Sequence, residues 1–410
     1  MCLDLVGTAS CPPSRIWRLR FDGATGDRAA VAALLAGRFP VVTLVTDHGG
    51  VVAGGRPGSE SPGVRAAAFD DLLAGCSQVV LAALDDRAAV LPAGPPPEQR
   101  RTSARPPGAV AARTMLSAAA HRAHRALYRT PHWRVGWRFV DGEEDAVVDR
   151  GELPRDGWND LPDDGRHFYA DPFPFTRGSG TWLFVEDFDH RRGRGVISVV
   201  DFDDAGPVGS PRPVLEHAVH LSYPLVLEDQ GEVWMIPETS GAGTIELYRA
   251  TRFPDAWVRE AVLVRDVVAS DATCFRHDGR WWMTATVRRG GSWSDALHLW
   301  YADRLCGPWT PHRGNPVLID ISSARPAGHV VRRPGRLVRP AQDGTRGYGS
   351  GLALAEIERL DEVEFRQRVV ARLSPGERWA GRRLHTLNRA GRLECIDGSA
   401  HSPRFRRSRA

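Results

Sequence analysis

The sequence predicts an all-β, five-bladed β-propeller in the C-terminal two thirds of the chain and a small α/β domain at its N-terminus. From Trp133 onward, short strand-like stretches alternate with turn residues, and one motif returns about every fifty residues. Before residue 85, apolar runs of four to six residues alternate with helical periods, which is typical of a small α/β unit.

The repeated motif is a hairpin whose second strand carries tryptophan in its first three copies. Residues 170–186, 222–238 and 270–286 align without a gap, at offsets of 52 and 48 residues. A fourth copy at residues 324–342 needs two extra residues in its turn, and a weaker fifth lies at residues 384–396. Gap-free agreement of three copies disfavours the alternative, a β-sandwich with accidental similarity.

Further strand-like stretches lie between these hairpins, at residues 196–202, 245–251, 297–303 and 352–357. Each unit is therefore expected to contain four antiparallel strands, and stacking around one axis would bury both faces of every unit. Five copies predict five blades, and residues 133–140 are expected to supply a closing strand to the last one.

The predicted regions are a small α/β domain at residues 1–85, a Pro- and Arg-rich linker and helix at 86–132, and the propeller at 133–410. The first region carries no glycine pattern of a nucleotide-binding loop. Its expected elements are parallel strands at 16–21, 41–46 and 78–84 and helices at 28–35 and 64–73, and the linker helix is expected at 111–127.

Composition argues against several classes of partner. The formal charge is +4, the sequence contains no lysine, and the two basic clusters, residues 121–138 and 404–409, are interpreted as a wet helix face and a frayed end. No nucleic-acid partner is therefore predicted. Six scattered cysteines predict neither a disulfide framework nor structural zinc.

Cellular location is predicted from what the chain's apolar segments lack. The N-terminus has no basic stretch followed by a long apolar one, and no apolar run approaches the length of a membrane span. We therefore expect a cytoplasmic protein without a membrane span. The sequence patterns do not distinguish a monomer from an oligomer.

The repeat also predicts where functional side chains gather. In a hairpin, the start of the first strand lies beside the end of the second, so these positions should meet at one mouth of a propeller. The expected ring consists of Asp171, Glu186, Tyr223, Glu238, Asp271, Arg325, Gln342, Asp343 and His385.

Several carboxylates around one cavity are what glycoside chemistry requires, because one acts as base or nucleophile and another as acid. Sugars also bind through aromatic faces and fans of hydrogen bonds. The side chains suited to this role are His220, Tyr223, Arg325, Gln342 and Tyr348. The alternative is that acids such as Glu186 and Asp343 are turn residues or ion pairs between blades.

Asp171-Pro-Phe and the repeat-equivalent Asp271 resemble the five-bladed arabinanase and xylosidase clan of glycosidases. The resemblance implies that Asp171 is the catalytic base and that Asp271 tunes the acid. Where the clan has a glutamate acid, this chain has Ala324-Arg325-Pro326, which leaves Glu238 as the candidate substitute. Some members of the clan hold a structural Ca²⁺ on the axis, for which His385 is the candidate contact. No cofactor or metal ligand is otherwise assigned.

A closer resemblance covers nearly the whole predicted propeller. Residues 220–224, 235–239, 323–328 and 339–343 resemble the N-terminal domain of plant glucosamine inositolphosphorylceramide transferases. Bacterial relatives carry this domain behind a formyltransferase-like segment, and residues 1–85 are similar to a shortened version without its Asn, His and Asp pattern. In the plant proteins, glycosyl transfer is attributed to a C-terminal domain without a counterpart here.

Three functions follow as hypotheses. The first is a glycosidase-like enzyme acting on a glycoside or glycoconjugate, with Asp171 as base, Asp271 as modulator and Glu238 as acid. The second is a non-catalytic module that binds a glycan or sugar phosphate through Arg325 and Arg339. The third is a transferase of secondary metabolism that uses the same pocket. The sequence favours the first narrowly, although an arginine in the acid's usual place fits the second or an anionic substrate.

Overall fold

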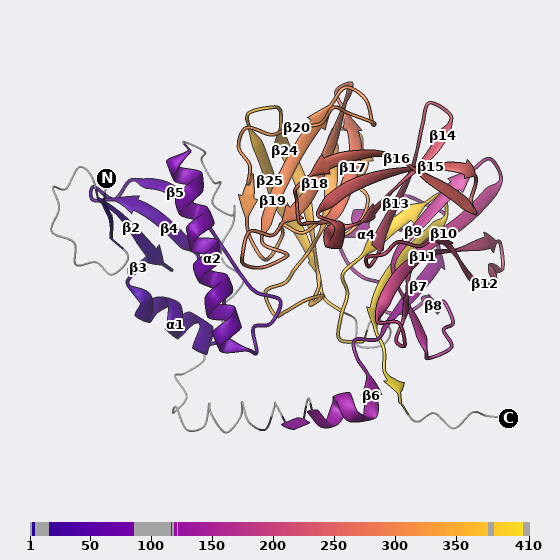
Figure 1. The fold of residues 1–410 in the computed structure, drawn as a ribbon, viewed down its shortest axis with the longest axis horizontal. Coiled ribbons are helices and arrows are strands. Elements are labelled where there is room, and N and C mark those ends of the chain that lie inside the picture. The colour runs from indigo at the N-terminus through magenta and orange to yellow at the C-terminus, as the bar shows by residue number, and fades with distance from the viewer. Residues whose placement is uncertain are drawn as a thin grey trace.

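The structure is a computed structural model, in which residues 2–4, 16–85, 116, 119–120, 122–375 and 381–404 are described (Figure 1). An N-terminal unit of sheet and helices lies beside a larger region made of antiparallel sheets. Most of the predicted linker, residues 86–115, lies outside the described residues. Of the predicted linker helix, residues 122–127 are helical.

The N-terminal unit contains one small sheet and two helices. Its strands are β1 (Cys2–Asp4), β2 (Ile16–Phe21), β3 (Ala24–Thr25), β4 (Val42–Thr46) and β5 (Val51–Gly55), and its helices are α1 (Asp27–Leu35) and α2 (Arg65–Leu84). The sheet order is β1-β2-β4-β5, with β3 on β2. Only β1 and β2 pair in parallel, whereas β2–β4 and β4–β5 are antiparallel. The prediction of parallel strands was therefore wrong for these pairs.

The strand predicted at residues 78–84 is instead the second half of α2. Ala68, Leu72, Cys76, Val79 and Ala83 are all buried, and their spacing of three or four residues marks one helix face. A short apolar run is ambiguous between strand and helix, and here the helical period over the longer stretch decides.

Helix α2 also has the length and composition of a membrane span. Its segment Ala66–Leu84 has a mean hydropathy of 1.5, and 44% of that window is buried inside the protein. The helix packs on Leu44 and neighbouring apolar residues of the sheet, and core helices pass the same test of composition. This is weak evidence for a membrane, and the absence of a span stays a prediction.

The larger region contains five antiparallel sheets of four or five strands among the described residues. The first comprises β9 (His167–Arg177), β10 (Gly180–Asp189), β11 (Arg194–Asp203) and β12 (Gly206–Leu215). The second comprises β13 (Ser222–Asp229), β14 (Glu232–Glu238), β15 (Thr244–Arg252) and β16 (Ala256–Arg265). The third comprises β17 (Ala269–His277), β18 (Arg280–Val287), β19 (Ala296–Ala302), β20 (Thr310–Pro311) and β21 (Leu318–Ile319).

The last two sheets are less regular. The fourth comprises β22 (Val331–Arg333), β23 (Arg336–Gln342), β24 (Leu352–Leu360) and β25 (Phe365–Leu373). The fifth comprises β26 (Leu387–Ala390), β27 (Leu393–Ser399), β7 (Trp133–Phe139) and β8 (Asn159–Asp160). Strand β7 pairs with β27 in antiparallel register, as expected for residues 133–140, so the last sheet joins the two ends of the region.

Short elements complete the fold. Strand β6 (Tyr128–Arg129) pairs with β28 (Ser402–Pro403), α4 (Val147–Arg150) follows β7, and a 3₁₀ turn, η2 (Ser240–Ala242), follows β14. Strand β9 packs against β13 and β26, which places the first strand of the first sheet beside the first strands of two other sheets. Apolar clusters fill the space between sheets, and the side chains of one of them include Phe184, Met235 and Met283.

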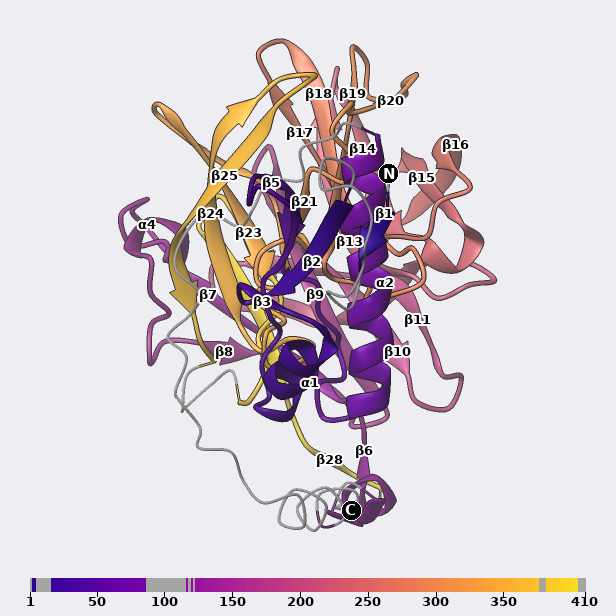
Figure 2. The ribbon, with the colours of Figure 1, turned by 90° about the vertical axis from the view of Figure 1, so that its left-hand side faces the viewer.

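The N-terminal unit and the larger region share one apolar core. Ile319 and Ile321 are fully buried among the side chains of the N-terminal sheet and α2. The backbone of Arg56 hydrogen-bonds to both isoleucines: its N–H donates to Ile319 O at 2.7 Å, and its carbonyl accepts from Ile321 N at 2.9 Å. Figure 2 shows the N-terminal unit lying across the larger region with α2 as its longest element.

Gly58 permits this close approach. A Cβ atom at Gly58 would lie 2.4 Å from Cγ1 of Ile321, far inside van der Waals contact. Its N–H also donates to Oδ2 of the buried Asp295 at 3.1 Å, so the backbone has little freedom to move away. Gly63, a few residues later in the same loop, has open space around the corresponding position.

We predict that Gly58→Ala destabilises the protein by about 1–3 kcal/mol, because the added methyl group must displace the Ile321 side chain or the loop. Thermal and urea unfolding of the full chain measure the effect, with Gly63→Ala as the matched control. Equal stability of the two variants would contradict the tight packing of the N-terminal unit on Ile321.

Candidate functional site

Three first strands bulge at the equivalent position. Asp171, Tyr223 and Asp271 have φ of 47°, 45° and 57°, the left-handed region that non-glycine residues seldom adopt. The strand pairing shifts register beside each of them. A bulge leaves a residue out of the ladder and re-aims its side chain and amide. Such strained residues recur at functional sites, which directs attention to this end of the sheets.

The amide of each bulged residue donates to a carboxylate from the preceding sheet. Asp171 N donates to Asp397 Oδ2 at 3.3 Å, Tyr223 N to Asp171 Oδ2 at 3.1 Å, and Asp271 N to Glu238 Oε2 at 3.3 Å. These contacts link the fifth, first, second and third sheets in succession. They also bring the acids of four sheets to one place.

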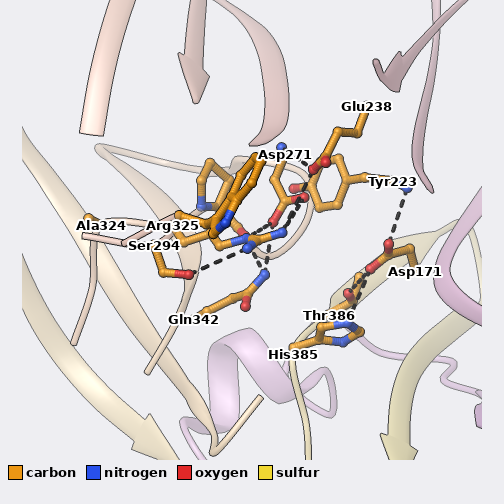
Figure 3. A network of polar contacts seen from close by, with 12 residues as sticks. Asp171, Tyr223, Glu238, Asp271, Ser294, Ala324, Arg325, Gln342, His385 and Thr386 are labelled. Carbon is orange, nitrogen blue, oxygen red and sulfur yellow. Dashed lines mark hydrogen bonds and ion pairs between the residues drawn. The ribbon is translucent and has the colours of Figure 1, made fainter. Parts of the chain in front are cut away.

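Asp171 is buried and its carboxylate is held by several partners (Figure 3). Besides Tyr223 N, it accepts a hydrogen bond from Thr386 Oγ1 at 2.8 Å, and His385 Nε2 lies 3.7 Å from Oδ1. Burial raises the pKa of Asp171 to about 6, with His385 opposing the rise and Asp271 adding to it. Its surroundings therefore favour the protonated form of Asp171 more than water does for an exposed aspartate.

His385 connects Asp171 to Asp397. Its Nδ1 lies 2.5 Å from Asp397 Oδ2, and its ring stacks on Trp133 with centroids 4.0 Å apart. Burial alone would lower the pKa of His385, but the carboxylates of Asp397 and Asp171 outweigh burial and raise it. The two buried acids thus favour the protonated, cationic form of this imidazole.

Asp171, His385 and Asp397 lie where the resemblance to the glycosidase clan implies a calcium ion. One ligand atom from each of Asp171, His385 and Asp397 lies within 4.8 Å of the others. Calcium prefers six to eight oxygen ligands. Here one ligand is an imidazole, and it contacts Asp397 directly at 2.5 Å. As placed, the three groups do not fit Ca²⁺ and instead form a charged contact set.

A second contact set surrounds Asp271. Arg325 Nε donates to Asp271 Oδ2 at 2.6 Å and its Nη2 to Oδ1 at 3.3 Å, while Gln342 Nε2 donates to Oδ2 at 2.8 Å. Arg325 Nη2 also lies 3.7 Å from Glu238 Oε2. Burial raises the pKa of Asp271 to about 6, although Arg325 opposes the rise. Arg325 therefore contacts two acids, Asp271 and Glu238, at once (Figure 3).

Glu186 and Tyr348 complete this cluster. It is called the mouth below and consists of Asp171, Glu186, Glu238, Asp271, Arg325, Tyr348, His385 and Asp397. Burial, followed by the charges of Asp171 and Glu238, raises the pKa of Glu186 well above its usual value. His220 Nε2 lies 3.4 Å from Glu186 Oε1, and burial lowers the pKa of this imidazole. The Tyr348 ring receives Arg325 on its face at 5.2 Å and meets His385 edge-on.

The N-terminal unit reaches this site through Glu60. Glu60 Oε1 accepts hydrogen bonds from Ser292 Oγ at 2.6 Å and Trp293 N at 3.0 Å, and its carbonyl accepts from Tyr348 N at 3.4 Å. The adjacent Ser294 contacts Arg325 Nη1 through its hydroxyl at 3.4 Å. The segment before α2 thus supports two loops that carry mouth residues.

Three predicted site residues have other roles. Tyr223 is fully buried, and its hydroxyl accepts from Gly328 N at 2.6 Å and bonds Thr273 Oγ1 at 2.9 Å. Arg339 is also fully buried, and its guanidinium binds the carbonyls of Ser323 and Ala324. The prediction that these two bind substrate was wrong, because neither side chain is accessible.

Asp343 is the third. Its carboxylate accepts from Thr345 and from Arg372 Nη1, the latter at 2.6 Å. The contact with Thr345 is the turn role that the sequence left open for Asp343, whereas Arg372 belongs to β25 of the same sheet and makes no ion pair between sheets. Arg339 still matters indirectly, because the carbonyls it binds belong to the loop that presents Arg325.

Sequence reasoning missed Asp397, Thr386 and Trp133 as site residues. Asp397 directly follows the fifth copy of the repeat, and extending that copy by one residue would have aligned it with Glu186 and Glu238. Thr386 follows the predicted His385. Trp133 was expected only in a closing strand, and no signal within the repeat marks its stacking on His385.

The comparisons with known proteins agree on the larger region. Residues 162–395 match the family model described as glucosamine inositolphosphorylceramide transferase 1, N-terminal. The protein of that name from Oryza sativa subsp. japonica is 34% identical over 233 residues, 54% of this chain and 31% of the relative. The Arabidopsis thaliana protein is 32% identical over 206 residues, 49% and 27%. The chain thus spans about a third of the length of these relatives.

Solved structures show a more distant likeness. A family 117 glycoside hydrolase from Zobellia galactanivorans has a TM-score of 0.41 at 11% identity, over 59% of this chain and 76% of that one. The GH43_1 enzyme from Xanthomonas citri has a TM-score of 0.40 at 13% identity, over 55% and 80%. Scores this low carry no conclusion about activity. The family model, in contrast, matches more than half of the sequence, and the chain belongs to the family of the glucosamine inositolphosphorylceramide transferase 1 N-terminal domain.

Proposed function

We propose that the five antiparallel sheets are the blades of a propeller and that its mouth binds the sugar part of a glycoconjugate. The N-terminal unit at residues 1–85 is then a small domain that packs on the propeller at Ile319 and Ile321 and is joined to it through residues 86–132. The observation that carries the function is the convergence of acids from four sheets, three of which accept a hydrogen bond from the amide of a bulged strand.

The charge of the mouth supports an amino sugar as ligand. Its carboxyl groups outnumber its two cationic groups, Arg325 and His385. The acids are Asp171, Glu186, Glu238, Asp271 and Asp397. Carboxylates accept hydrogen bonds from sugar hydroxyls and pair with an ammonium group. Of the five acids, Glu238 alone is partly exposed, so it is the first to meet a ligand.

The contacts of Asp271 and Glu238 favour a role in binding over a role in bond cleavage. Arg325 contacts both carboxylates, whereas a general acid needs a proton and freedom to reach the leaving group. The two acids and the guanidinium form one ion-pair set that shapes the mouth. The sequence hypothesis of Glu238 as the catalytic acid loses support from this arrangement.

One observation favours glycoside chemistry as a second candidate. Burial raises the pKa of Glu186 well above its usual value, while the pKa of Asp171 is raised to about 6. Two carboxyl groups whose environments separate their pKa values are the usual acid and base of a glycosidase. In this reading Glu186 donates the proton and Asp171 is the base. A transferase would use the same pair with an acceptor in place of water.

Sugar binding is tested by calorimetric titration of the full chain with glucosamine and with glucose. We predict tighter binding of glucosamine at neutral pH and a loss of about tenfold in affinity in Glu238→Gln, because a charge-assisted hydrogen bond becomes a neutral one. Glu232→Gln, at the exposed start of the same strand, is the matched control. Equal affinity for both sugars, unchanged in Glu238→Gln, would contradict the proposal.

Turnover is tested with p-nitrophenyl glycosides and a released-sugar assay. If the mouth only binds, wild type and Asp171→Asn release no sugar above background. If the second candidate is correct, wild type releases sugar, and both Asp171→Asn and Glu186→Gln abolish release while the variants stay folded by circular dichroism. Release that survives in both variants would exclude these two residues as the catalytic pair.

The raised pKa of Asp171 also predicts a pH dependence of stability. The folded state binds this proton more tightly than the unfolded state, so its contribution is present below about pH 4 and is lost as the pH rises through about 6. A shift of about two pKa units corresponds to about 3 kcal/mol. Urea unfolding between these pH values should therefore show wild type losing stability relative to Asp171→Asn. Asp204→Asn, at an exposed position, is the control, and a constant difference between wild type and Asp171→Asn would contradict the prediction.

A further inference from the structure

A cavity lined by arginines lies at the edge of the first sheet. It has a volume of about 450 Å³, and its walls include Phe188, His190 and four arginines. The arginines come from distant parts of the chain, namely Arg129, Arg166, Arg191 and Arg404. Strands β6 and β28 pair here, which brings Arg129 and the segment preceding Arg404 together. Two members of this set belong to the basic clusters that the sequence suggested were solvated.

Most of this positive charge is not neutralised within the protein. Asp189 accepts from Arg166 Nη2 at 2.7 Å and from Nε at 3.2 Å, so these two groups satisfy each other. Among the described residues, no carboxylate lies within ion-pair distance of Arg129, Arg191 or Arg404. Arg129 and Arg404 spend part of their donors on backbone carbonyls, and each guanidinium has five N–H groups to offer.

His190 adds a polar group without adding charge. Its Nε2 lies 3.0 Å from His132 Nδ1, and the two rings stack with centroids 5.3 Å apart. Burial and the neighbouring His132, Arg129 and Arg404 lower the pKa of His190 to about 4. A neutral imidazole here leaves the arginines as the source of the field in the cavity.

The cavity is close to the acidic mouth. Phe188 lines the cavity, and its ring meets the His220 ring edge-on with centroids 6.0 Å apart. His220 Nε2 in turn lies 3.4 Å from Glu186 Oε1. His190 directly follows β10 and lies four positions after Glu186, a separation of about 13 Å if the chain between them is extended. One ligand of ordinary size could therefore occupy both places.

We propose that this arginine-lined cavity binds the phosphate group of the glycoconjugate whose sugar occupies the mouth. Guanidinium groups match the oxygens of a phosphate in pairs, and three of them without carboxylate partners suit a group that carries one or two negative charges. The proposal deepens the proposed function and rests on it for the identity of the whole ligand. Anion binding by the cavity itself is independent of the mouth.

The decisive variant is Arg191→Ala. Arg191 lies in the exposed turn between β10 and β11, and none of the described residues accepts a hydrogen bond from its guanidinium, so its removal should not disturb folding. Arg313→Ala, at an exposed position in the turn after β20 (Thr310–Pro311), removes the same charge away from the cavity.

Calorimetric titration with inorganic phosphate is the first experiment. We expect wild type and Arg313→Ala to bind with the same affinity and Arg191→Ala to bind about tenfold more weakly, with Arg129→Ala/Arg191→Ala weaker still. Binding should weaken with added sodium chloride, since salt screens exposed charges. Equal phosphate affinity in wild type and Arg191→Ala, or none in wild type, would overturn the proposal.

The second experiment separates the cavity from the mouth and one phosphate source from another. Glu238→Gln should keep its affinity for inorganic phosphate, and Arg191→Ala should keep its affinity for glucosamine. Stronger binding of glucose 1-phosphate than of inorganic phosphate would assign soluble sugar phosphates. Binding to vesicles of phosphatidylinositol but not of phosphatidylcholine, lost in Arg191→Ala, would assign a lipid headgroup. Phosphate affinity that rises in Glu238→Gln and is unchanged in Arg191→Ala would place the anion in the mouth, where the carboxylate repels it, and would overturn the proposal.

Discussion

The hydrogen bond from a bulged strand's amide to a carboxylate of the preceding sheet is the contact on which the rest of the site depends. It occurs at Asp171, Tyr223 and Asp271, each in a left-handed backbone conformation that costs energy. The carboxylate gains a directed donor, and the strained backbone gains a partner for an amide that the ladder no longer satisfies. These donors make the burial of Asp397, Asp171 and Glu238 at one place more tolerable, whereas Asp271 is held by Arg325 and Gln342.

The remaining negative charge is balanced unevenly. Arg325 serves Asp271 and Glu238, His385 serves Asp171 and Asp397, and Glu186 has only the weakly basic His220 beside it. Burial then raises the pKa of Glu186 most clearly, because no neighbouring cation offsets the loss of water. The mouth thus contains two pairs of acids that each contact a basic group, Arg325 or His385, and one further acid, Glu186, beside a weakly basic imidazole. The nearby arginine-lined cavity has the opposite charge.

Much of this could be predicted from the sequence, because the repeat fixes both the strands and the positions that open and close them. Asp171, Glu186, Glu238 and Asp271 were found in this way, and the structure brings them together. Arg339 and Tyr223 were assigned wrongly, since position in a repeat does not reveal whether a side chain points into the mouth or beneath it. The helix α2 was broken in two because a short apolar run suits either a strand or a buried helix. The arginine-lined cavity could not be found, because its walls come from segments that lie far apart in the sequence.

The shared core around Ile319 and Ile321 has a practical consequence for anyone who divides the chain. A fragment that starts at Trp133 would place both isoleucines, and the rest of that patch, against water. Apolar patches of this kind favour association between molecules. Poor solubility of such a fragment would therefore reflect a severed interface and would carry no information about whether its sheets can fold.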